Sequence, residues 1–427
     1  MSNTHINLNI RSLKPSATLA INERIAELKS QNKKVYSFGL GQSPFHVPAE
    51  VVKELQKHAA EKDYLPVQGL LKLRQSVADF HNRYEHLNFK AENILIGPGS
   101  KELIFLTQLV FYGEILFPAP SWVSYHPQAK IIGNNVHFIP TDFDSRWLLS
   151  GEHLEAFCGA ENDPEKPRIL ILNYPSNPVG STYSANELED LVVVLKKYNI
   201  TVISDEIYGL LHHNGEHRSI ATLYPEKTII SSGISKWCGA GGWRLGTFAF
   251  PKDLDWLLNG MKVAASETFT SVSAPIQYAA VKAFEGSSDI DNYLVHSRRV
   301  LSVIGNWCYN QLIQKQIRLI KPEGGFYLFP SFRNYSEKLK HRGITTGKEL
   351  AEAILMETGV ACLPGEDFGL KPKHLVLRMA YVNFNGKNAI NQSIKLNINP
   401  LPESFVKDNC QDIHTGILKL LDWIEQL

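Results

Sequence analysis

The chain has 427 residues, more than one hydrophobic core usually supports, so we expect two domains. Hydrophobic residues make up 44% and charged residues 20%, and the formal net charge is +1, which excludes a strongly basic nucleic-acid-binding or membrane-surface protein. The 5 cysteines are widely spaced without a CxxC pair, so the sequence indicates neither a zinc site nor a disulfide framework, and we expect no metal.

The N-terminal residues 1–14 are polar and lack the basic-then-apolar layout of a signal peptide. No apolar run is long enough to span a bilayer. We therefore expect a cytoplasmic protein in a reducing setting, with neither a membrane nor a nucleic-acid partner.

Short apolar runs alternate with helical patterns through the middle of the chain. Several runs are continuously apolar, which is typical of strands buried on both faces of a parallel sheet. The predicted strands are Ile94–Ile96, Ile115–Phe117, Val136–Ile139, Ile169–Leu172, Thr201–Ser204, Thr228–Ser231 and Thr247–Phe250. Between two of them, Ser184 and Glu187 predict a capping box for an amphipathic helix. This alternation predicts an α/β fold.

The residues after about 288 show a different pattern. A long helical pattern over Ile290–Gln314 predicts a link to a second domain. Beyond it the sequence predicts a closing amphipathic helix, preceded by a Gly-rich hairpin at Glu323–Pro330, a helix near Lys348–Glu357 and a loop over Asn383–Ser404. We expect an N-terminal segment (1–47) that packs with the small domain, a large domain (48–290) and a C-terminal small domain (291–427).

Unusual polar residues follow three of the predicted strands. Asn177 follows the strand that ends near Leu172, and Lys236 follows the strand that ends near Ser231. Asp205 and Tyr208 come directly after the strand between them. In open parallel sheets, ligands bind outside the carboxyl ends of the strands, so we expect these side chains at one rim. An amide, a carboxylate, a phenol and an amine gathered there match the needs of one cofactor, pyridoxal 5'-phosphate (PLP).

Each of these side chains suits one part of PLP. Lys236 can form a Schiff base with the aldehyde and then act as the catalytic base and acid. A buried carboxylate at Asp205 favours the protonated ring nitrogen, which makes the ring an electron sink. Asn177 and Tyr208 can donate hydrogen bonds to the phenolic oxygen.

The phosphate of PLP needs positive charge and N–H donors. Arg244 lies in Gly241-Gly-Trp-Arg-Leu-Gly246, shortly after Lys236, and its planar guanidinium suits a bidentate grip. Ser100 and Lys101 lie where a helical run begins, and free N–H groups at a helix start bind anions. Lys101 equally fits a solvated lysine at a helix start.

These motifs resemble fold-type I PLP-dependent aminotransferases of classes I and II, and the matching landmarks extend from Lys14 to Arg378. The resemblance implies a large domain with a mostly parallel central sheet between helices, and a smaller α/β domain built from both termini. It also implies that Trp122, in Pro120-Ser-Trp-Val-Ser-Tyr125, stacks on the cofactor ring. Arg378 would bind the α-carboxylate of the substrate, and Gly41 and Asn177 would help to hold the substrate.

The resemblance also implies a homodimer with shared active sites, because Tyr64 would reach the phosphate of the partner subunit. One residue departs from the family pattern. The family usually has a serine three residues before the lysine, where this chain has Gly233. Ser232 and Ser235 are the candidates to replace that phosphate contact.

A second resemblance bears on the substrate. The stretch Lys14-Pro-Ser-Ala-Thr18 and Lys101 resemble the bacterial aspartate/prephenate-type subgroup, in which residues at the positions of Ser16, Thr18 and Lys101 contact an acidic substrate side chain. The loop Gln42-Ser-Pro-Phe45 departs from the Glu-Pro-Asp-Phe of that subgroup, which leaves the amino donor and acceptor open.

The function implied is a ping-pong aminotransferase, which moves an amino group between an L-α-amino acid and a 2-oxo acid. A PLP-dependent lyase, decarboxylase or synthase on the same fold is the alternative, and release of ammonia, pyruvate or CO2 would distinguish it. A ligand sensor fused to a helix-turn-helix module is a further alternative. The segment before Gly41 is short and not basic, which disfavours such a module.

Overall fold

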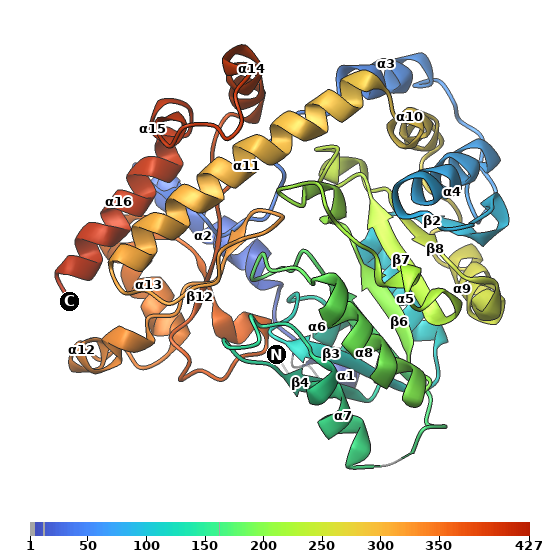
Figure 1. Cartoon of the computed structure of the whole chain (residues 1–427), viewed down its shortest axis with the longest axis horizontal. Coiled ribbons are helices and arrows are strands. Elements are labelled where there is room, and N and C mark those ends of the chain that lie inside the picture. Colours follow the sequence, from blue (N-terminus) through green and yellow to red (C-terminus); the bar gives the residue numbers. More distant parts are fainter. Residues whose placement is uncertain (1–4, 12, 162) are drawn as a thin grey trace.

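A seven-stranded sheet forms the centre of the larger part of the molecule (Figure 1). The computed structural model describes residues 5–11, 13–161 and 163–427. The strand order is β2-β8-β7-β6-β5-β3-β4, and only β8 is antiparallel to its neighbours. The strands are β2 Ile94–Gly97, β3 Glu114–Ala119, β4 Val136–Pro140, β5 Arg168–Asn173, β6 Thr201–Asp205, β7 Thr228–Gly233 and β8 Gly246–Ala249. All the strands predicted from apolar runs are confirmed, with small shifts at their ends.

Helices pack on both faces of this sheet. Alternate residues of one strand belong to different core clusters, with Ile169 and Ile171 on one face and Leu170 and Leu172 on the other. The helices of this part are α3 Ala49–Lys57, α4 Leu71–Glu85, α5 Ser100–Val110, α6 Tyr125–Ile132, α7 Gly151–Gly159, α8 Ala185–Lys197, α9 Asp255–Ser266 and α10 Ala274–Glu285. The predicted capping box at the start of α8 is confirmed, because Ser184 and Glu187 satisfy each other's backbone N–H groups.

The smaller α/β part is built from both ends of the chain. The long helix α11 (Ser288–Gln314) runs toward it from the side of α3 and α10 (Figure 1). Strand β1 (Tyr36–Ser37) pairs in parallel with β10 (Val360–Ala361), so early and late segments share a sheet. The other elements are α2 Ala17–Ser30, β9 Tyr327–Leu328, α12 Ser336–His341, α13 Gly347–Thr358, β11 Leu363–Pro364, β12 Leu377–Ala380, α14 Gly386–Leu396, α15 Ser404–Asn409 and α16 Gln411–Glu425. The short helix α1 (Leu8–Arg11) lies against α6 of the larger part, where the Asn9 amide donates to the Ile131 backbone oxygen. The fold class is confirmed, while the domain boundaries stay a prediction.

Two segments differ from the sequence-based prediction. The range Asn383–Ser404 is not a loop throughout, because it contains α14, which Asn385 caps by accepting a hydrogen bond from the Asn388 N–H. The many polar residues of α14 concealed its periodicity. The range Glu323–Pro330 is not a hairpin, because its strand β9 pairs with the distant β12 instead.

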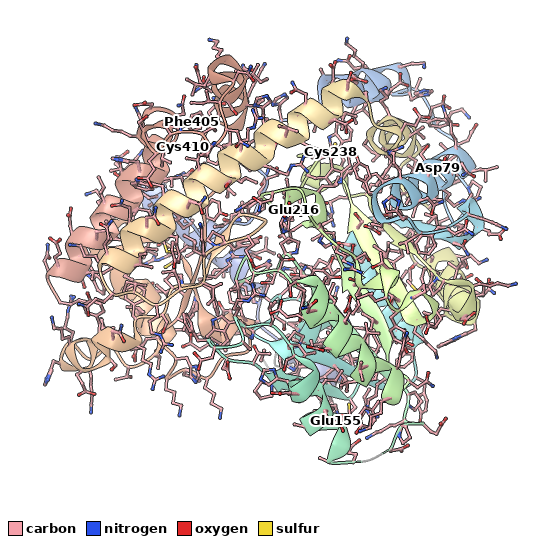
Figure 2. All side chains as sticks on the ribbon, in the orientation of Figure 1. Asp79, Glu155, Glu216, Cys238, Phe405 and Cys410 are labelled. Atoms are coloured by element: carbon pink, nitrogen blue, oxygen red, sulfur yellow. The ribbon has the colours of Figure 1, made fainter. Side chains whose placement is uncertain are left out.

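All 5 cysteines are free and buried. Cys238, which follows the predicted catalytic lysine by two positions, is fully buried, and burial raises the pKa of its thiol (Figure 2). Cys238 is therefore a small core residue and not a reactive thiol. Among the described residues, no helix combines the length and the apolar character that a membrane crossing needs.

Candidate active site

The polar residues that follow β5, β6 and β7 gather at the carboxyl end of the central sheet. In the strand register, Asn173 pairs with Asp205, and Asp205 pairs with Ser231. The side-chain amide of Asn173 donates to the backbone oxygen of Asp205 at 2.7 Å, and its Oδ1 accepts from the Asn177 N–H at 2.8 Å. The end of β5 therefore fixes the turn that carries Asn177 at the rim where Asp205 lies.

Asp205 is a buried carboxylate at this rim, with 4% of its surface exposed. Its Oδ2 accepts a hydrogen bond from the Tyr125 hydroxyl at 2.6 Å, and its Oδ1 accepts one from the Ser231 hydroxyl at 3.2 Å. Burial raises the pKa of Asp205 to about 6, and the two hydroxyls oppose that rise. A cationic nitrogen placed here would stabilise the ionised carboxylate.

Lys236 extends into the same space from the loop after β7. Its Nζ donates to the Gly41 backbone oxygen at 2.6 Å and lies 5.5 Å from the centre of the Tyr208 ring. Burial and, to a smaller extent, the Arg378 guanidinium lower the pKa of Lys236 to about 8, against the opposing effect of Asp205. Lys236 therefore loses its proton far more readily than a surface lysine, as a nucleophile and general base requires.

Two tyrosines and a glycine form the wall behind the lysine. The hydroxyls of Tyr208 and Tyr327 lie 2.7 Å apart, and both side chains are buried. A Cβ atom on Gly41 would clash with the Tyr327 hydroxyl, so this position admits only glycine. The structure thus places Gly41 and Tyr208 together with Lys236, and it adds Tyr327, which the sequence did not indicate.

Arg378 is 1% exposed and lies beside Asn177. One of its terminal nitrogens donates to Asn177 Oδ1 at 3.4 Å and the other to the Gly39 backbone oxygen. The buried Nε has no hydrogen-bond partner among the described residues. An unsatisfied guanidinium N–H of this kind is stabilised by an anionic acceptor, and a carboxylate suits it in geometry and charge.

Arg244 meets the N-terminus of α5. Its two terminal nitrogens donate to the backbone oxygens of Gly241 at 3.0 Å and Pro98 at 3.2 Å. A Cβ atom on Gly99 would clash with this guanidinium, so the glycine lets it reach the helix start at Ser100. The guanidinium and the free N–H groups of α5 together make an anion site.

Trp122 is half-buried and lies between this anion site and Asp205. Its ring is 5.2 Å, centre to centre, from that of Tyr125, the tyrosine bonded to Asp205. The ammonium of Lys101, near the start of α5, lies 5.5 Å from the centre of the Trp122 ring. The Trp122 ring thus lies between the anion site and Asp205, which is the position expected of a residue that stacks on the cofactor ring.

The departure at Gly233 has a physical reason. A Cβ atom there would lie 2.7 Å from the backbone oxygen of Leu245, which directly precedes the neighbouring strand β8, so a serine would not fit. Ser232 lines a separate cavity and is not available to the anion site. Ser235 is half-buried and forms no hydrogen bond with a described residue, so its predicted cofactor contact stays a prediction.

Tyr64 is not part of the site formed by its own chain. The side chain is 90% exposed and forms neither a hydrogen bond nor a ring contact with the residues above. This is the arrangement expected if Tyr64 serves a neighbouring subunit.

A family model described as "Aminotransferase class I and II" matches residues 33–385, most of the chain. The chain belongs to this family. It is accordingly a PLP-dependent aminotransferase, which transfers an amino group between an amino acid and a 2-oxo acid.

Several known aminotransferases are similar over nearly their whole length. An aspartate aminotransferase of Bacillus sp. (strain YM-2) is 32% identical over 84% of this chain and 91% of its own. An asparagine–oxo-acid transaminase of Streptococcus mutans is 29% identical over 91% of this chain and 98% of its own. The solved aspartate aminotransferase of Rhizobium meliloti superposes with a TM-score of 0.79 at 25% identity, covering 91% of this chain and 97% of its own.

The residues of this aminotransferase fit PLP at each of its polar groups. Lys236 offers the amine with a lowered pKa, and Asp205 is a buried carboxylate without a cationic hydrogen-bond donor among the described residues. Arg244 and the N-terminus of α5 offer a binding site for the phosphate. A side chain at Gly99 would occupy the space of this site. Arg378 retains an unsatisfied N–H for the substrate carboxylate. The donor set therefore agrees with the cofactor that the family uses.

Two side chains that the sequence reasoning did not single out also lie in the candidate site, namely Tyr125 and Ser231. Both bond to Asp205, and both occupy positions with a recognisable signal. Tyr125 follows the predicted stacking residue by three positions, and Ser231 is in register with Asp205 on the next parallel strand. For Ser231, the available clue was a polar residue inside an otherwise apolar strand at the same rim.

Substitution of Tyr125 by phenylalanine is expected to lower kcat by about 10-fold and the free energy of unfolding by about 1–3 kcal/mol. Loss of this donor raises the pKa of Asp205 further, so the acidic limb of the kcat–pH profile should move to higher pH. A pH series of steady-state rates measures the shift. Tyr112→Phe, at a 94% exposed tyrosine, is the control and should change neither quantity. An unmoved acidic limb would show that the hydrogen bond does not tune Asp205.

Proposed function

We propose that this aminotransferase acts by a ping-pong mechanism on an acidic amino acid of the aspartate or glutamate kind. When bound, PLP supplies an aldehyde that accepts the amino group and a ring that withdraws electrons. The remaining chemistry is assigned to the side chains of the candidate site, with Lys236 as the catalytic residue. The curated relatives named aspartate aminotransferase, at 32% identity, support the substrate class.

Lys236 carries the proton in this proposal. Its amine takes the proton from the substrate Cα and returns it at the carbon next to the transferred nitrogen, acting in turn as base and acid. The lowered pKa of about 8 keeps a substantial share of the amine neutral near physiological pH. Gly41 accepts a hydrogen bond from Nζ through its backbone oxygen, which orients the amine. The Asp205 carboxylate would stabilise the protonated ring nitrogen of the bound cofactor.

Arg378 orients the substrate. Its unsatisfied Nε and the adjacent Asn177 amide form a recognition site for the α-carboxylate. The buried guanidinium cannot move far, because Gly39 and Asn177 hold its two terminal nitrogens. The Cα proton would therefore be presented to Lys236 in a fixed orientation.

The position of Lys101 is the observation that supports an acidic substrate. Its ammonium lies over Trp122, and no described carboxylate forms an ion pair with it. A cation without an acidic partner at the mouth of the site suits a second substrate carboxylate. Ser16 and Thr18 share a hydrogen bond of 2.9 Å, and Ser16 lines a cavity of about 640 Å³ that also touches Val123, next to Trp122.

The substrate class is tested by adding single amino acids to the PLP-loaded protein and following loss of the cofactor absorbance band. We expect aspartate or glutamate to react at least about 10-fold faster than alanine or phenylalanine. Lys101→Ala should lower kcat/KM for the acidic substrate by about 10–100-fold, which corresponds to one charged contact, and leave alanine nearly unchanged. Lys62→Ala, at an exposed lysine, is the control. Equal losses for acidic and neutral amino acids would refute the role of Lys101.

We also propose a homodimer with shared active sites. Tyr64 and Arg244 are both exposed in the single chain, although Arg244 belongs to the anion site. Large apolar side chains are also exposed in the larger part of the molecule, including Leu71 at 62% and Trp256 at 55%. A second copy would cover such surface and bring its Tyr64 to the phosphate. A reducing, cytoplasmic setting completes this proposal and agrees with the free cysteines.

Mixing two inactive or weakened proteins tests the sharing of sites. Tyr64→Phe and Lys236→Ala chains are unfolded together and refolded with PLP, so that hybrid dimers form. One site of each hybrid has both native residues, and we expect activity clearly above the mean of the two parents. Tyr112→Phe mixed with Lys236→Ala is the control for refolding yield. Activity no higher than the parental mean would refute the shared site.

A further inference from the structure

A cavity of about 90 Å³, separate from the active site, lies on the side of Glu206 and Trp237. Asp205 bonds to Tyr125 on the cofactor side, whereas the next residue, Glu206, lines this cavity. Trp237 likewise lines it and directly follows Lys236. The cavity therefore adjoins two active-site residues along the chain but does not belong to the site described above.

Three potential metal ligands converge on this cavity. One ligand atom each of Glu85, Glu206 and His217 lies within 4.8 Å of the other two. Glu206 is held firmly, because its Oε1 accepts from Ser204 at 2.7 Å and from Ser219 at 2.6 Å. Its Oε2 lies 2.9 Å from His217 Nε2. Glu85 comes from a different element, the last turn of α4, so a bound ion would join two distant segments.

Several polar atoms in the cavity are buried without a hydrogen-bond partner among the described residues. They are Glu85 Oε2, His217 Nδ1 and both ring nitrogens of His81, which is 1% exposed. His81 lies one helical turn before Glu85, with its Nδ1 3.4 Å from Glu85 Oε2. Buried polar atoms are nearly always satisfied in native proteins, so this group of unsatisfied atoms around one cavity indicates a missing ligand.

The charges around the cavity favour a cation. Two carboxylates face the cavity, since Glu206 is buried and the Glu85 side chain is only 10% exposed. The C-terminal end of α4 adds partial negative charge. Arg298 also lines the cavity, but it forms no ion pair with either glutamate among the described residues. The basic side chains that come within ion-pair distance of the two carboxylates are both histidines, His81 and His217.

We propose that this cavity binds one divalent first-row transition metal ion, such as Zn²⁺, through Glu85, Glu206 and His217, with His81 as the fourth ligand. Mixed imidazole and carboxylate ligands suit such ions, whereas Mg²⁺ and Ca²⁺ prefer oxygen ligands alone. Ligand atoms about 2.1 Å from one ion lie at most about 4.2 Å apart, so closure needs only small side-chain movements. The ion would tie α4 to the loop behind Asp205.

Sequence reasoning did not indicate this site because its ligands come from separate segments, and only His81 and Glu85 lie close together along the chain. The pair sits at positions i and i+4 of a helix, which is a common feature of ordinary helices as well. His217 lies in the loop after β6, next to Glu216, which Figure 2 labels. The fold, and not a motif, brings the set together.

Metal binding is measured on the full-length, PLP-loaded protein after removal of metals with EDTA. Titration with ZnCl2 should show one tightly bound Zn²⁺ ion per chain (one tight equivalent). Bound Zn²⁺ should raise the Tm of the protein by about 3–5 °C. Glu85→Gln keeps the shape of the side chain and should weaken this equivalent at least about 100-fold and abolish the Tm shift. His81→Asn is a second variant that keeps the test valid if Glu85→Gln does not fold.

The control is Glu61→Gln, which removes an exposed carboxylate 3.3 Å from His58, where Zn²⁺ could bind at the surface. It should leave the tight equivalent unchanged. Anomalous scattering at the zinc edge should place the ion between Glu85 and His217. An unchanged tight equivalent in Glu85→Gln or His81→Asn, an anomalous peak elsewhere, or no tight equivalent in the native protein would each overturn the proposal.

Discussion

Replacement of Lys236 by alanine is expected to lower kcat for transamination by at least about 10⁴-fold with every amino acid tested. The side chain has two tasks in the proposed mechanism, since it attaches the cofactor and moves the substrate proton. Among the described residues, no other amine is hydrogen-bonded at this position, where Gly41 accepts from Nζ. Steady-state rates measure the loss, and borohydride reduction followed by peptide mass analysis locates the cofactor on residue 236 in the native protein.

Two further variants make the Lys236 result specific. Lys236→Arg keeps a positive charge but cannot lose its proton, so it should be as inactive as the alanine variant. Lys252→Ala removes an exposed lysine outside the site and should retain native kcat. Borohydride labelling of a different lysine, or more than about 1% residual kcat in Lys236→Ala, would contradict the assignment of the catalytic residue.

Asp205→Asn is expected to lower kcat by about 10²–10³-fold, the effect typical of a lost preorganised electrostatic group. The amide retains an oxygen that can accept from Tyr125, but it cannot carry the negative charge that holds the cofactor ring cationic. The reaction rate with saturating amino acid measures the effect. Asp79→Asn, at an exposed carboxylate on α4, is the control for a simple change of net charge.

The same substitution should stabilise the cofactor-free protein at neutral pH. The pKa of Asp205 is about 6 in the folded chain, compared with 3.8 for an ordinary aspartate, because burial disfavours the ion. The folded state therefore binds the proton more tightly, and its stability falls as pH rises from about 4 to 6. The amide introduced by Asp205→Asn does not ionise and avoids this loss. We expect the variant to gain up to about 3 kcal/mol at pH 8.

Urea unfolding of cofactor-free native and variant protein across pH 4–8 tests this second effect. The difference in unfolding free energy should be smallest at pH 4, where the carboxyl of Asp205 is protonated in the folded state and only partly ionised in the unfolded state. PLP should reduce the difference at pH 8, because a cationic ring nitrogen offsets the cost of the buried carboxylate. A difference that does not vary with pH would show that desolvation of Asp205 is not its cause.

The sheet and the main polar residues of the site were predictable for a shared physical reason. A strand buried on both faces must be apolar throughout, so runs such as Ile169–Leu172 are conspicuous, and a polar residue at the end of such a run is equally conspicuous. Parallel strands then bring their carboxyl ends to one edge. The adjacency of Asn177, Asp205 and Lys236 follows from these two facts alone.

Other features depended on contacts that no local pattern records. Tyr327 reaches the site because β9 pairs with the distant β12, whereas local reasoning paired it within a hairpin. The helix α14 was missed because its buried face is short and its remaining residues are polar. The exclusion of serine at Gly233 depends on the backbone of Leu245, which lies beside it just before the next strand. Tertiary packing determines each of these features, so the local sequence pattern could not predict them.

The pairing of Tyr36 with Val360 has a consequence for how the protein is made. A ribosome that adds about 5–20 residues per second exposes the first of these residues roughly 20–60 s before the second. The early strand has no partner during that interval, in which all strands of the central sheet, from Ile94 to Ala249, are synthesised. Cotranslational assembly should therefore proceed from the middle of the chain outward, with the N-terminal segment waiting for the last third of the polypeptide before it can dock.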